Sequence, residues 1–242
     1  MLLNKIIFAA RLLRSMKSYL IGLILVIICV SCQTDSSVQN GTNSASDATQ
    51  ITPQETYPLG SNIEPGRLAW QKPEFVIGLL GDLEDKVVAD IGAGAGYFAF
   101  RLLNRASSII AIEINPEMIT LMDEFSAHLD STLQIKFETR LATPDDAMLK
   151  NAEVDVMLII NTIGYIEGRS NYLTNLRSSL KENGRIVIVD FKMKQLPENI
   201  APDRSNRVIL LDLQDELEAA GYQLIYTDDT SLDFQYIVIA EN

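Results

Sequence analysis

Cysteine and histidine are almost absent from this sequence of 242 residues. The only cysteines, Cys29 and Cys32, lie near the N-terminus, and the only histidine is His128. A disulfide framework, a thiolate metal site or a Ser-His-Asp triad needs several such residues close together. The sequence therefore predicts no metal site and no histidine-activated nucleophile. We expect His128 to rest on the edge of the core, on a helix, and to take no part in chemistry.

Basic residues are also few. The chain has 20 lysines and arginines against 32 acidic residues, which gives a formal net charge of −12. A surface this acidic repels a phosphate backbone, and no stripe of basic and aromatic residues occurs in the sequence, so we expect no nucleic-acid partner. Because 47% of the residues are hydrophobic, the chain can bury one sizeable core. One folded domain with extensions is therefore the expected organisation.

The first 32 residues have the pattern of an export signal. Basic residues in 1–17 precede an apolar run at 19–30, which is shorter than the roughly 20 residues of a membrane-spanning helix. Val30-Ser31-Cys32 resembles a bacterial lipobox, in which the cysteine becomes the lipidated first residue. Residues 1–32 are thus predicted to attach the protein to a membrane of the cell envelope through Cys32. An uncleaved anchor is the alternative, and the protein is cytoplasmic if the segment is not a functional signal.

A polar segment separates this signal from the folded part. Residues 33–56 contain Ser, Thr, Asn, Asp, Gln and Ala with almost no large apolar side chain. Such a composition buries too little surface to offset the entropy of ordering the chain. We predict a disordered tether at 33–56 and a folded domain at 57–242.

A glycine-rich turn is the centre of the folded part. Residues 87–91 form a short, β-branched apolar run, residues 92–96 read GAGAG, and helical spacing follows. Glycines at a strand-to-helix turn let the backbone approach a ligand, and the free N–H groups of the helix start then face that ligand. The predicted binding residues here are Asp90, Gly92, Gly94, Gly96 and Tyr97.

Residues 90–96, DIGAGAG, resemble the first motif of the class I S-adenosylmethionine-dependent methyltransferases. The G-x-G-x-G spacing differs from the G-x-G-x-x-G of dinucleotide enzymes, which disfavours an oxidoreductase. Residues 180–191, LKENGRIVIVDF, are similar to a later strand of the same family. The resemblance covers about residues 64–240 and implies S-adenosyl-L-methionine as cofactor. It also implies an α/β fold with a doubly wound, Rossmann-like, seven-stranded, mostly parallel sheet, helices on both faces and an antiparallel last strand.

A second acid follows the apolar run at 108–112. Strand, helix and strand within this length predict a right-handed βαβ unit, which places Glu113 at the carboxyl end of the second strand, beside the glycine turn. A carboxylate there can accept two hydrogen bonds from a ribose diol; a solvated strand-end acid is the alternative. Asp90 and Glu113 would hold polar groups of the cofactor. Tyr97 would offer its π-face to the sulfonium or simply pack.

The third strand is predicted at 133–138, and a loop with a helix start follows at 141–146. Many relatives carry Asp where Thr143 stands, so the resemblance implies that this loop contacts the adenine through Thr143 or Asp145. Either Asp145 or Asp146 equally suits the N-cap of a helix.

The run at 154–161 is apolar enough to be a strand buried on both faces. In the family that it resembles, catalytic or substrate-facing residues follow this strand. Close relatives often carry a pair of histidines near Gly164 and Tyr165, and this chain has none there. Asn161 and Tyr165 are therefore the candidate catalytic residues, with positioning roles, and Asn161 is also a candidate cofactor contact.

Residues 67–74, RLAWQKPE, resemble a segment that precedes the first strand in a bacterial subgroup of the family. They predict either a packing helix anchored by Trp70 or a lid over the cofactor. Because a sulfonium methyl is already electrophilic, the protein needs to align a nucleophile with it and to exclude water. The sequence thus predicts methyl transfer to an unidentified small-molecule, lipid or protein acceptor. The alternative is an envelope-tethered, catalytically inactive module of the same fold that binds a nucleoside or S-adenosyl ligand.

Overall fold

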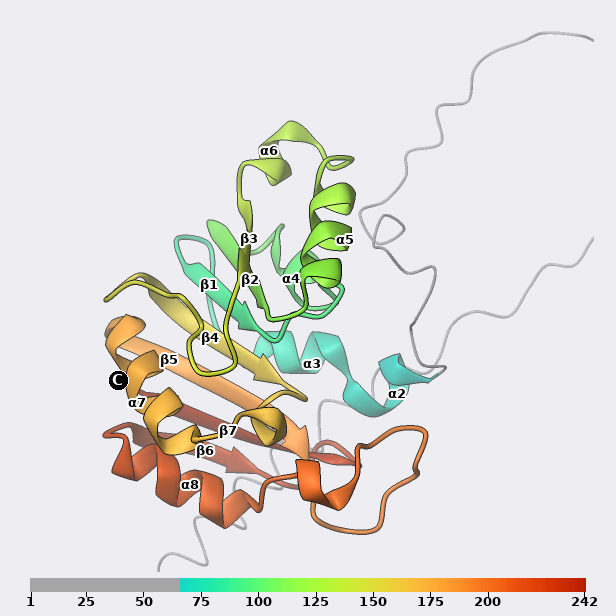
Figure 1. The fold of residues 1–242 in the computed structure, drawn as a ribbon, viewed down its shortest axis with the longest axis vertical. Helices are drawn as coiled ribbons and strands as arrows, with labels where there is room; N and C mark the ends of the chain where they lie inside the picture. Colours follow the sequence, from blue (N-terminus) through green and yellow to red (C-terminus); the bar gives the residue numbers. More distant parts are fainter. Residues whose placement is uncertain (1–65) are drawn as a thin grey trace, which may run out of the picture. The chain divides into compact units, whose positions relative to one another are not determined.

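The computed structural model describes residues 66–242 (Figure 1). The predicted signal at 1–32, the tether at 33–56 and Cys32 lie outside the described residues, and the boundary at residue 57 stays a prediction. Within residues 66–242, no helix has both the length and the apolar character needed to cross a membrane.

A seven-stranded sheet forms the framework (Figure 1). Its strand order is β3-β2-β1-β4-β5-β7-β6, in which β1 to β5 run parallel and β7 runs antiparallel to both of its neighbours. The strands are β1 Val87–Ile91, β2 Ser108–Glu113, β3 Phe137–Leu141, β4 Val154–Ile160, β5 Leu180–Phe191, β6 Gln223–Asp228 and β7 Gln235–Glu241. The predicted doubly wound sheet with an antiparallel last strand is confirmed.

Helices cover both faces of the sheet (Figure 1). Residues of α3, α4 and α5 pack on one face, and residues of α7 and α8 pack on the other. The helices are α2 Arg67–Gln71, α3 Pro73–Gly78, α4 Ala99–Leu102, α5 Pro116–Ser126, α6 Ser131–Gln134, α7 Arg169–Ser179 and α8 Leu210–Ala219, with 3-10 turns η2 Ile163–Tyr165 and η3 Arg204–Asn206.

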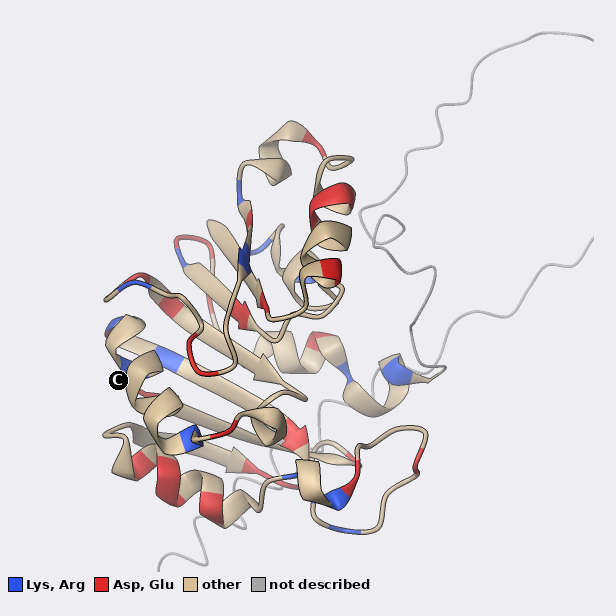
Figure 2. Ribbon diagram, viewed as in Figure 1, with Lys and Arg blue, Asp and Glu red and all other residues tan. Residues whose placement is uncertain are grey.

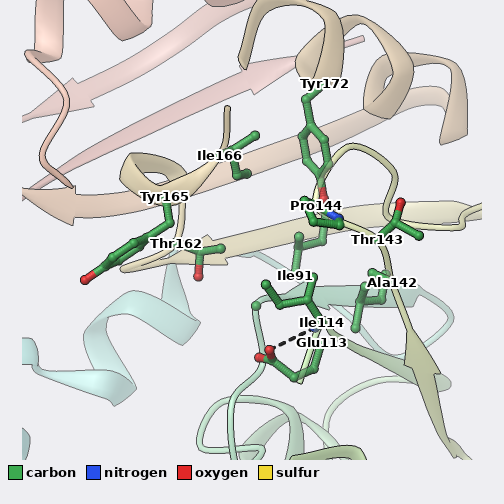
Figure 3. A pocket seen from close by; sticks show the side chains of 12 residues that line it. Ile91, Glu113, Ile114, Ala142, Thr143, Pro144, Thr162, Tyr165, Ile166 and Tyr172 are labelled. Carbon is green, nitrogen blue, oxygen red and sulfur yellow. Dashed lines mark hydrogen bonds between the residues drawn. The ribbon is translucent and has the colours of Figure 1, made fainter. Parts of the chain in front are cut away.

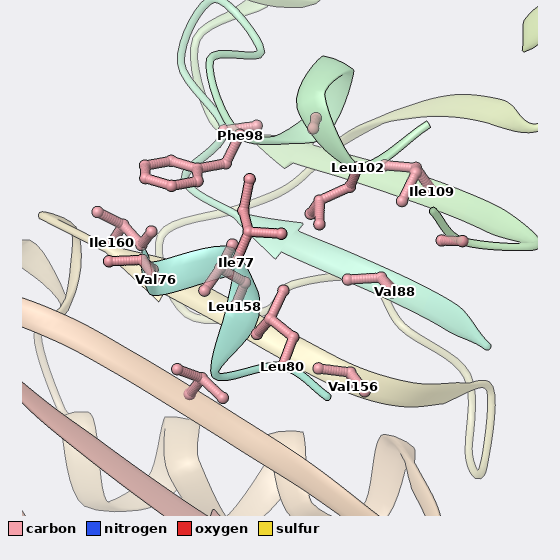
Figure 4. Packing of buried hydrophobic residues seen from close by; sticks show 14 of the residues in the cluster. Val76, Ile77, Leu80, Val88, Phe98, Leu102, Ile109, Val156, Leu158 and Ile160 are labelled. Atoms are coloured by element: carbon pink, nitrogen blue, oxygen red, sulfur yellow. The ribbon is translucent and has the colours of Figure 1, made fainter. Parts of the chain in front are cut away.

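Alternate residues of the central strand β4 face different cores. Val156, Leu158 and Ile160 join the core under α3 to α5 (Figure 4), and Met157 and Ile159 join the core under α7 and α8. This follows from the two-residue period of a strand. Because helices bury both faces, the strand from Val156 to Ile160 is entirely apolar.

The third strand differs from its prediction at 133–138. Residues 131–134 form α6, and β3 begins only at Phe137. Asp130 caps this helix, because its Oδ1 accepts a hydrogen bond from the backbone N–H of Thr132 at 2.9 Å. A local N-cap therefore decided the conformation of a stretch whose apolar residues had suggested a strand.

The strand order creates a crevice at the end of β1. The chain passes from β1 to β2 on one side and reaches β4 on the other, so β1 lies between strands whose connections leave in opposite directions. Ligands of doubly wound folds bind at this point, outside the carboxyl ends of the strands. The glycine turn follows β1 directly and therefore lies at this crevice.

Candidate functional site

A pocket of about 240 Å³ opens at the carboxyl ends of β1, β2 and β4 (Figure 3). It joins segments that are far apart in the sequence. Among the predicted residues, its lining includes Gly92, Glu113, Thr143 and Tyr165. These residues come from the glycine turn, the end of β2, the loop after β3 and the turn η2, so the fold brings the expected segments to one place.

The three glycines of the turn serve two different purposes. Gly92 and Gly94 both have positive φ, 75° and 57°. A Cβ on Gly92 would lie 2.2 Å from Oγ1 of Thr162, so this glycine lets the end of β4 pack against the turn. A Cβ on Gly94 would meet nothing within 4 Å, so this residue faces open space where a ligand can approach. A Cβ on Gly96 would lie 2.5 Å from the ring of Phe100, which makes Gly96 a packing residue.

Glu113 is tied to the glycine turn. Its Oε2 accepts a hydrogen bond from the backbone N–H of Gly94 at 2.8 Å. Its Oε1 accepts from the N–H groups of Ile114 at 2.8 Å and Asn115 at 3.0 Å (Figure 3 draws the first of these). A carboxylate has about four lone-pair positions, so one remains for a hydroxyl donor. The structure places Glu113 beside the turn as expected, and its contact with a ribose stays a prediction.

Asp90 is the buried acid of the site. The residue is 3% exposed, and its Oδ2 has no hydrogen-bond partner in the described part of the chain. Burial raises the pKa of its carboxyl to about 7; a backbone hydrogen bond from Ala99 and the charge of Arg67 act in the opposite direction. A buried polar atom without a partner is costly, so Asp90 is suited to receive a positively charged or hydrogen-bonding group of a ligand.

Tyr97 is occupied by protein cations. The guanidinium carbons of Arg67 and Arg101 lie 3.9 and 3.8 Å from the centre of its ring. The ring also packs at the edge of the core, and Tyr97 is not part of the pocket lining. The structure therefore favours the packing alternative for Tyr97 over a contact with a sulfonium.

The loop after β3 presents Thr143 to the pocket. Its Oγ1 donates a hydrogen bond to Oδ1 of Asp145 at 2.8 Å, and its backbone N–H donates to the carbonyl of Asp146 at 3.0 Å. No helix begins between β3 and β4, so the N-cap alternative for Asp145 and Asp146 is wrong. The loop instead closes as a tight turn on its own polar groups, in which Asp145 orients Thr143.

The end of β4 supplies a different set from the predicted pair. Thr162 and Tyr165 line the pocket, whereas Asn161 adopts a left-handed φ of 58° beside it. Burial, together with the charges of Asp190 and Asp203, raises the pKa of the Tyr165 hydroxyl. That hydroxyl is neutral at pH 7 and does not serve as a base there.

Tyr172 was missed by sequence reasoning. It lies on α7, is buried, and lines the pocket, and Figure 3 shows its hydroxyl directed toward Pro144. Burial raises the pKa of this hydroxyl to about 12. The sequence marks Tyr172 only as an apolar position of a helix, so its place could be found only from the fold. Thr162 had a signal, because it stands next to Asn161 at the strand end.

The helix α2 is anchored rather than loose. The indole of Trp70 lies 6.0 Å from the ring of Phe191 and 6.1 Å from that of Phe234, measured between ring centres. Trp70 is buried. The structure thus favours the packing alternative for this tryptophan, while Arg67 of the same helix extends over Tyr97 at the glycine turn.

Comparison with known proteins gives the family. A sequence profile described as "Methyltransferase domain" matches residues 82–231, which is more than half of the chain, so the protein belongs to this family. With the fold above, it is a class I S-adenosylmethionine-dependent methyltransferase, and its cofactor is S-adenosylmethionine.

Individual relatives are more distant. The tRNA U34 carboxymethyltransferase of Campylobacter fetus subsp. fetus (strain 82-40) is 29% identical over 108 residues, which are 44% of this chain and 37% of that protein. The match thus spans well under half of that relative's length.

Two solved structures show the same fold. A SAM-dependent methyltransferase from Aquifex aeolicus superposes with a TM-score of 0.66 at 21% identity, over 74% of this chain and 93% of that one. The [4+2]-cyclase SpnF superposes with a TM-score of 0.63 at 12% identity, over 77% and 86%. At these identities the likeness concerns the fold alone, and SpnF carries a different activity in its name.

The residues in and directly beside the pocket fit this cofactor. Gly94 leaves open space at the turn, Glu113 retains acceptor capacity, and the carboxyl of Asp90 has an unpartnered oxygen. The bound cofactor supplies an electrophilic methyl group on a sulfonium. The chain's own residues would bind and orient that group and exclude water from it.

Proposed function

We propose that this protein transfers a methyl group from S-adenosylmethionine to a small-molecule acceptor that enters from the β4 side of the crevice. One observation carries the proposal: Thr162 and Tyr165, at the end of β4, line the same pocket as Gly92 and Glu113 (Figure 3). A nucleophile held at the first pair thereby lies next to the groups that are suited to hold the cofactor. Such alignment is the main requirement for methyl transfer.

The charge of the protein supports a small acceptor over a nucleic acid. The curated relative is named for a tRNA base, but this chain carries a net charge of −12. Acidic residues recur along α5 and α8 and at the ends of strands (Figure 2). Phosphate backbones bind to basic surfaces, so a tRNA would meet repulsion here. Lipid and protein acceptors are the remaining candidates beside a metabolite.

Catalysis would proceed without a histidine or an ionised tyrosine as base in the pocket. Tyr165 has a raised pKa, and the chain's only histidine, His128, lies after α5 and not in the pocket lining. We infer that the acceptor brings a nucleophile that needs no protein base, or loses its proton to water after transfer. The lack of a histidine in the pocket lining also supports the second candidate function, a catalytically inactive module that binds the cofactor or its product.

Isotope transfer tests the proposal. The full-length protein would be incubated with S-adenosylmethionine labelled in its methyl group and, separately, with a metabolite extract, a lipid extract, total tRNA and a protein extract. We expect label in the metabolite fraction only. Label in tRNA would contradict the acceptor class. Binding of S-adenosylhomocysteine by calorimetry without label in any fraction would support the inactive module instead.

We also propose that the protein is held at the cell envelope through Cys32. The support is the pattern of residues 1–32 and the polar composition of 33–56. Labelled palmitate should appear on the full-length protein and be absent from Cys32→Ser, which should also leave the membrane fraction. Cys32→Ser that stays fully in the membrane fraction without processing would instead indicate an uncleaved anchor.

A further inference from the structure

A chain of side-chain hydrogen bonds runs from α2 to the end of β4. Nε of Arg67 donates to Oε1 of Gln71 at 2.6 Å, and Nε2 of Gln71 donates to Oε1 of Gln235 at 3.4 Å. Nε2 of Gln235 then donates to Oδ1 of Asn161. Gln71 and Gln235 are both 0% exposed, so neither amide can exchange its partner for water.

The hydrogen bonds of this series all run from donor to acceptor in the same order, and Arg67 determines that order. A guanidinium group only donates hydrogen bonds, whereas an amide donates at one end and accepts at the other. Because Arg67 donates, Gln71 must turn its oxygen to it and its nitrogen onward. The same step repeats at Gln235, and Asn161 therefore receives a donor on its oxygen. An amide turned the other way would leave two donors facing each other in a buried place, which is costly.

The last amide in this series of hydrogen bonds, that of Asn161, has a nitrogen that is not bonded within the series. Asn161 is half-buried, and Nδ2 points away from Gln235 because Oδ1 points toward it. No acceptor among residues 66–242 is bonded to this nitrogen, and the next residue, Thr162, lines the pocket. Asn161 is not itself part of the pocket lining, but it directly precedes Thr162, which is, so a group at the β4 edge of the pocket would meet the donor Nδ2 rather than the bonded Oδ1.

We propose that Asn161 donates a hydrogen bond to a neutral oxygen, such as a carbonyl, that the acceptor carries next to its methylated atom. Gln71 and Gln235 are the positioning residues that fix this orientation from a distance. A neutral oxygen fits better than an anion, because the acid Glu113 lines the same pocket in a protein of net charge −12. The inference names the acceptor class of the proposed methyltransferase and rests on that function.

One substitution at a distance from Asn161 can reverse the order of donors and acceptors in this series of hydrogen bonds. Gln71→Glu keeps the bond to Arg67 but replaces the donor with a second acceptor. Gln235 should then turn its nitrogen to residue 71, and Asn161 should turn its nitrogen to Gln235. Gln235→Glu should turn Asn161 in the same way. In both variants the amide protons of Asn161 become bonded inside the protein.

Nuclear magnetic resonance of the side-chain amide of Asn161 measures this change in the full-length protein, with the signal assigned by its loss in Asn161→Ser. We expect these protons to exchange with water about tenfold more slowly in Gln71→Glu and Gln235→Glu than in the unchanged protein, because a hydrogen bond of ordinary net strength protects by about that factor. Gln214→Glu is the matched control. Gln214 on α8 donates a hydrogen bond to Thr227 on β6, so this substitution adds the same charge at a different place. Equal exchange in all four proteins would overturn the proposal.

Small probes test the acceptor class in the same samples. With S-adenosylhomocysteine bound, acetone, whose carbonyl only accepts hydrogen bonds, should shift the Asn161 amide signal of the unchanged protein, and methylammonium, which only donates, should not. In Gln71→Glu methylammonium should shift the signal and acetone should not. An unchanged signal with acetone would contradict the acceptor class, even if the orientation is correct. Absence of S-adenosylhomocysteine binding in calorimetry would instead contradict the proposed function, so the two failures are distinguishable.

Discussion

The two sides of the crevice hold their polar groups in different ways. On the β1–β2 side, the carboxylate of Glu113 accepts hydrogen bonds from backbone N–H groups. The donor farthest away in the sequence is Gly94, at 19 residues. On the β4–β7 side, the groups are side chains from distant segments: Gln71 and Gln235 are 164 residues apart, and Gln235 and Asn161 are 74 apart. The first arrangement is local in sequence, and the second exists only when the sheet is complete.

This difference determines how each side responds to substitution. Backbone donors cannot be removed by exchanging a side chain. Ligand binding on the β1–β2 side is therefore tested by adding a side-chain atom that fills the space beside the glycine turn. A buried side chain on the β4–β7 side can be replaced one group at a time. The predictions below test this contrast, beginning with the largest expected effect.

Replacing Gly92 or Gly94 of the turn with alanine should have two different effects, one on stability and one on cofactor binding. Gly92→Ala should lower the free energy of unfolding by roughly 4 kcal/mol, because it adds left-handed strain and a Cβ at 2.2 Å from Thr162. Gly94→Ala should cost only about 1 kcal/mol of strain, since its Cβ enters open space, yet it should weaken cofactor binding strongly. Urea unfolding and calorimetry with S-adenosylhomocysteine measure the two effects. Unchanged affinity in folded Gly94→Ala would contradict the assignment of the site.

Stability should depend on pH through Asp90. The folded pKa of about 7 exceeds the ordinary value of 3.8, so the folded state binds more protons between these values. The free energy of unfolding should therefore fall as the pH rises from about 4 to 7. Asp90→Asn should equal the unchanged protein near pH 4 and exceed it above pH 7 by on the order of 3 kcal/mol.

Urea unfolding across this pH range measures the difference between the two proteins. Asp190, whose pKa burial raises to about 6, contributes a slope of the same sign but is present in both. Its contribution thus cancels in the comparison. A difference between Asp90→Asn and the unchanged protein that stays constant with pH would show that Asp90 titrates normally in the fold.

Removing the charge of Glu113 should affect binding more than folding. Glu113→Gln should weaken binding of S-adenosylhomocysteine by about 1.5–3 kcal/mol, the scale of a hydrogen bond to a charged group. Glu117→Gln, an exposed acid in the first turn of α5, is the matched control and should bind normally. If both variants bind as the unchanged protein does, the ribose lies elsewhere.

The smallest effect is expected at His128. Its ring is exposed beyond the end of α5, with Nδ1 at 2.7 Å from the carbonyl oxygen of Glu124. It therefore does not rest on the core edge, where the helical spacing had placed it. His128→Gln should change the free energy of unfolding by about 0.5 kcal/mol or less and leave cofactor affinity unchanged. Loss of methyl transfer at normal cofactor affinity would reopen the search for a base.

The same contrast explains what the sequence could predict. Most strands, the pairing of the first two and the place of Glu113 followed from apolar runs, glycines and the handedness of βαβ units, whereas the seven-stranded sheet as a whole was implied by the family resemblance. Each of these signals is local. The turn at Gly92 and Gly94 was recognisable because glycine adopts positive φ without strain and lets the backbone approach a ligand.

The parts that the sequence could not predict depend on distant contacts. Tyr172 reads as a core position of a helix, and Gln71 and Gln235 read as ordinary polar residues, until the fold brings them to the crevice. Tyr97 looked available to a ligand, but arginines from two segments cover its ring. The spacing of residues along the sequence carries no information about such contacts between distant segments.

The position of β7 has a consequence for synthesis on the ribosome. This strand is the last of the sheet to be translated, yet it lies between β5 and β6 and supplies Gln235. Until residues 235–241 have left the exit tunnel, β6 lacks its neighbour in the sheet and Asn161 lacks its tie to α2. A nascent chain therefore cannot form the bond between Gln235 and Asn161 before β7 has emerged, and a premature stop before Gln235 would remove β7 and this bond together.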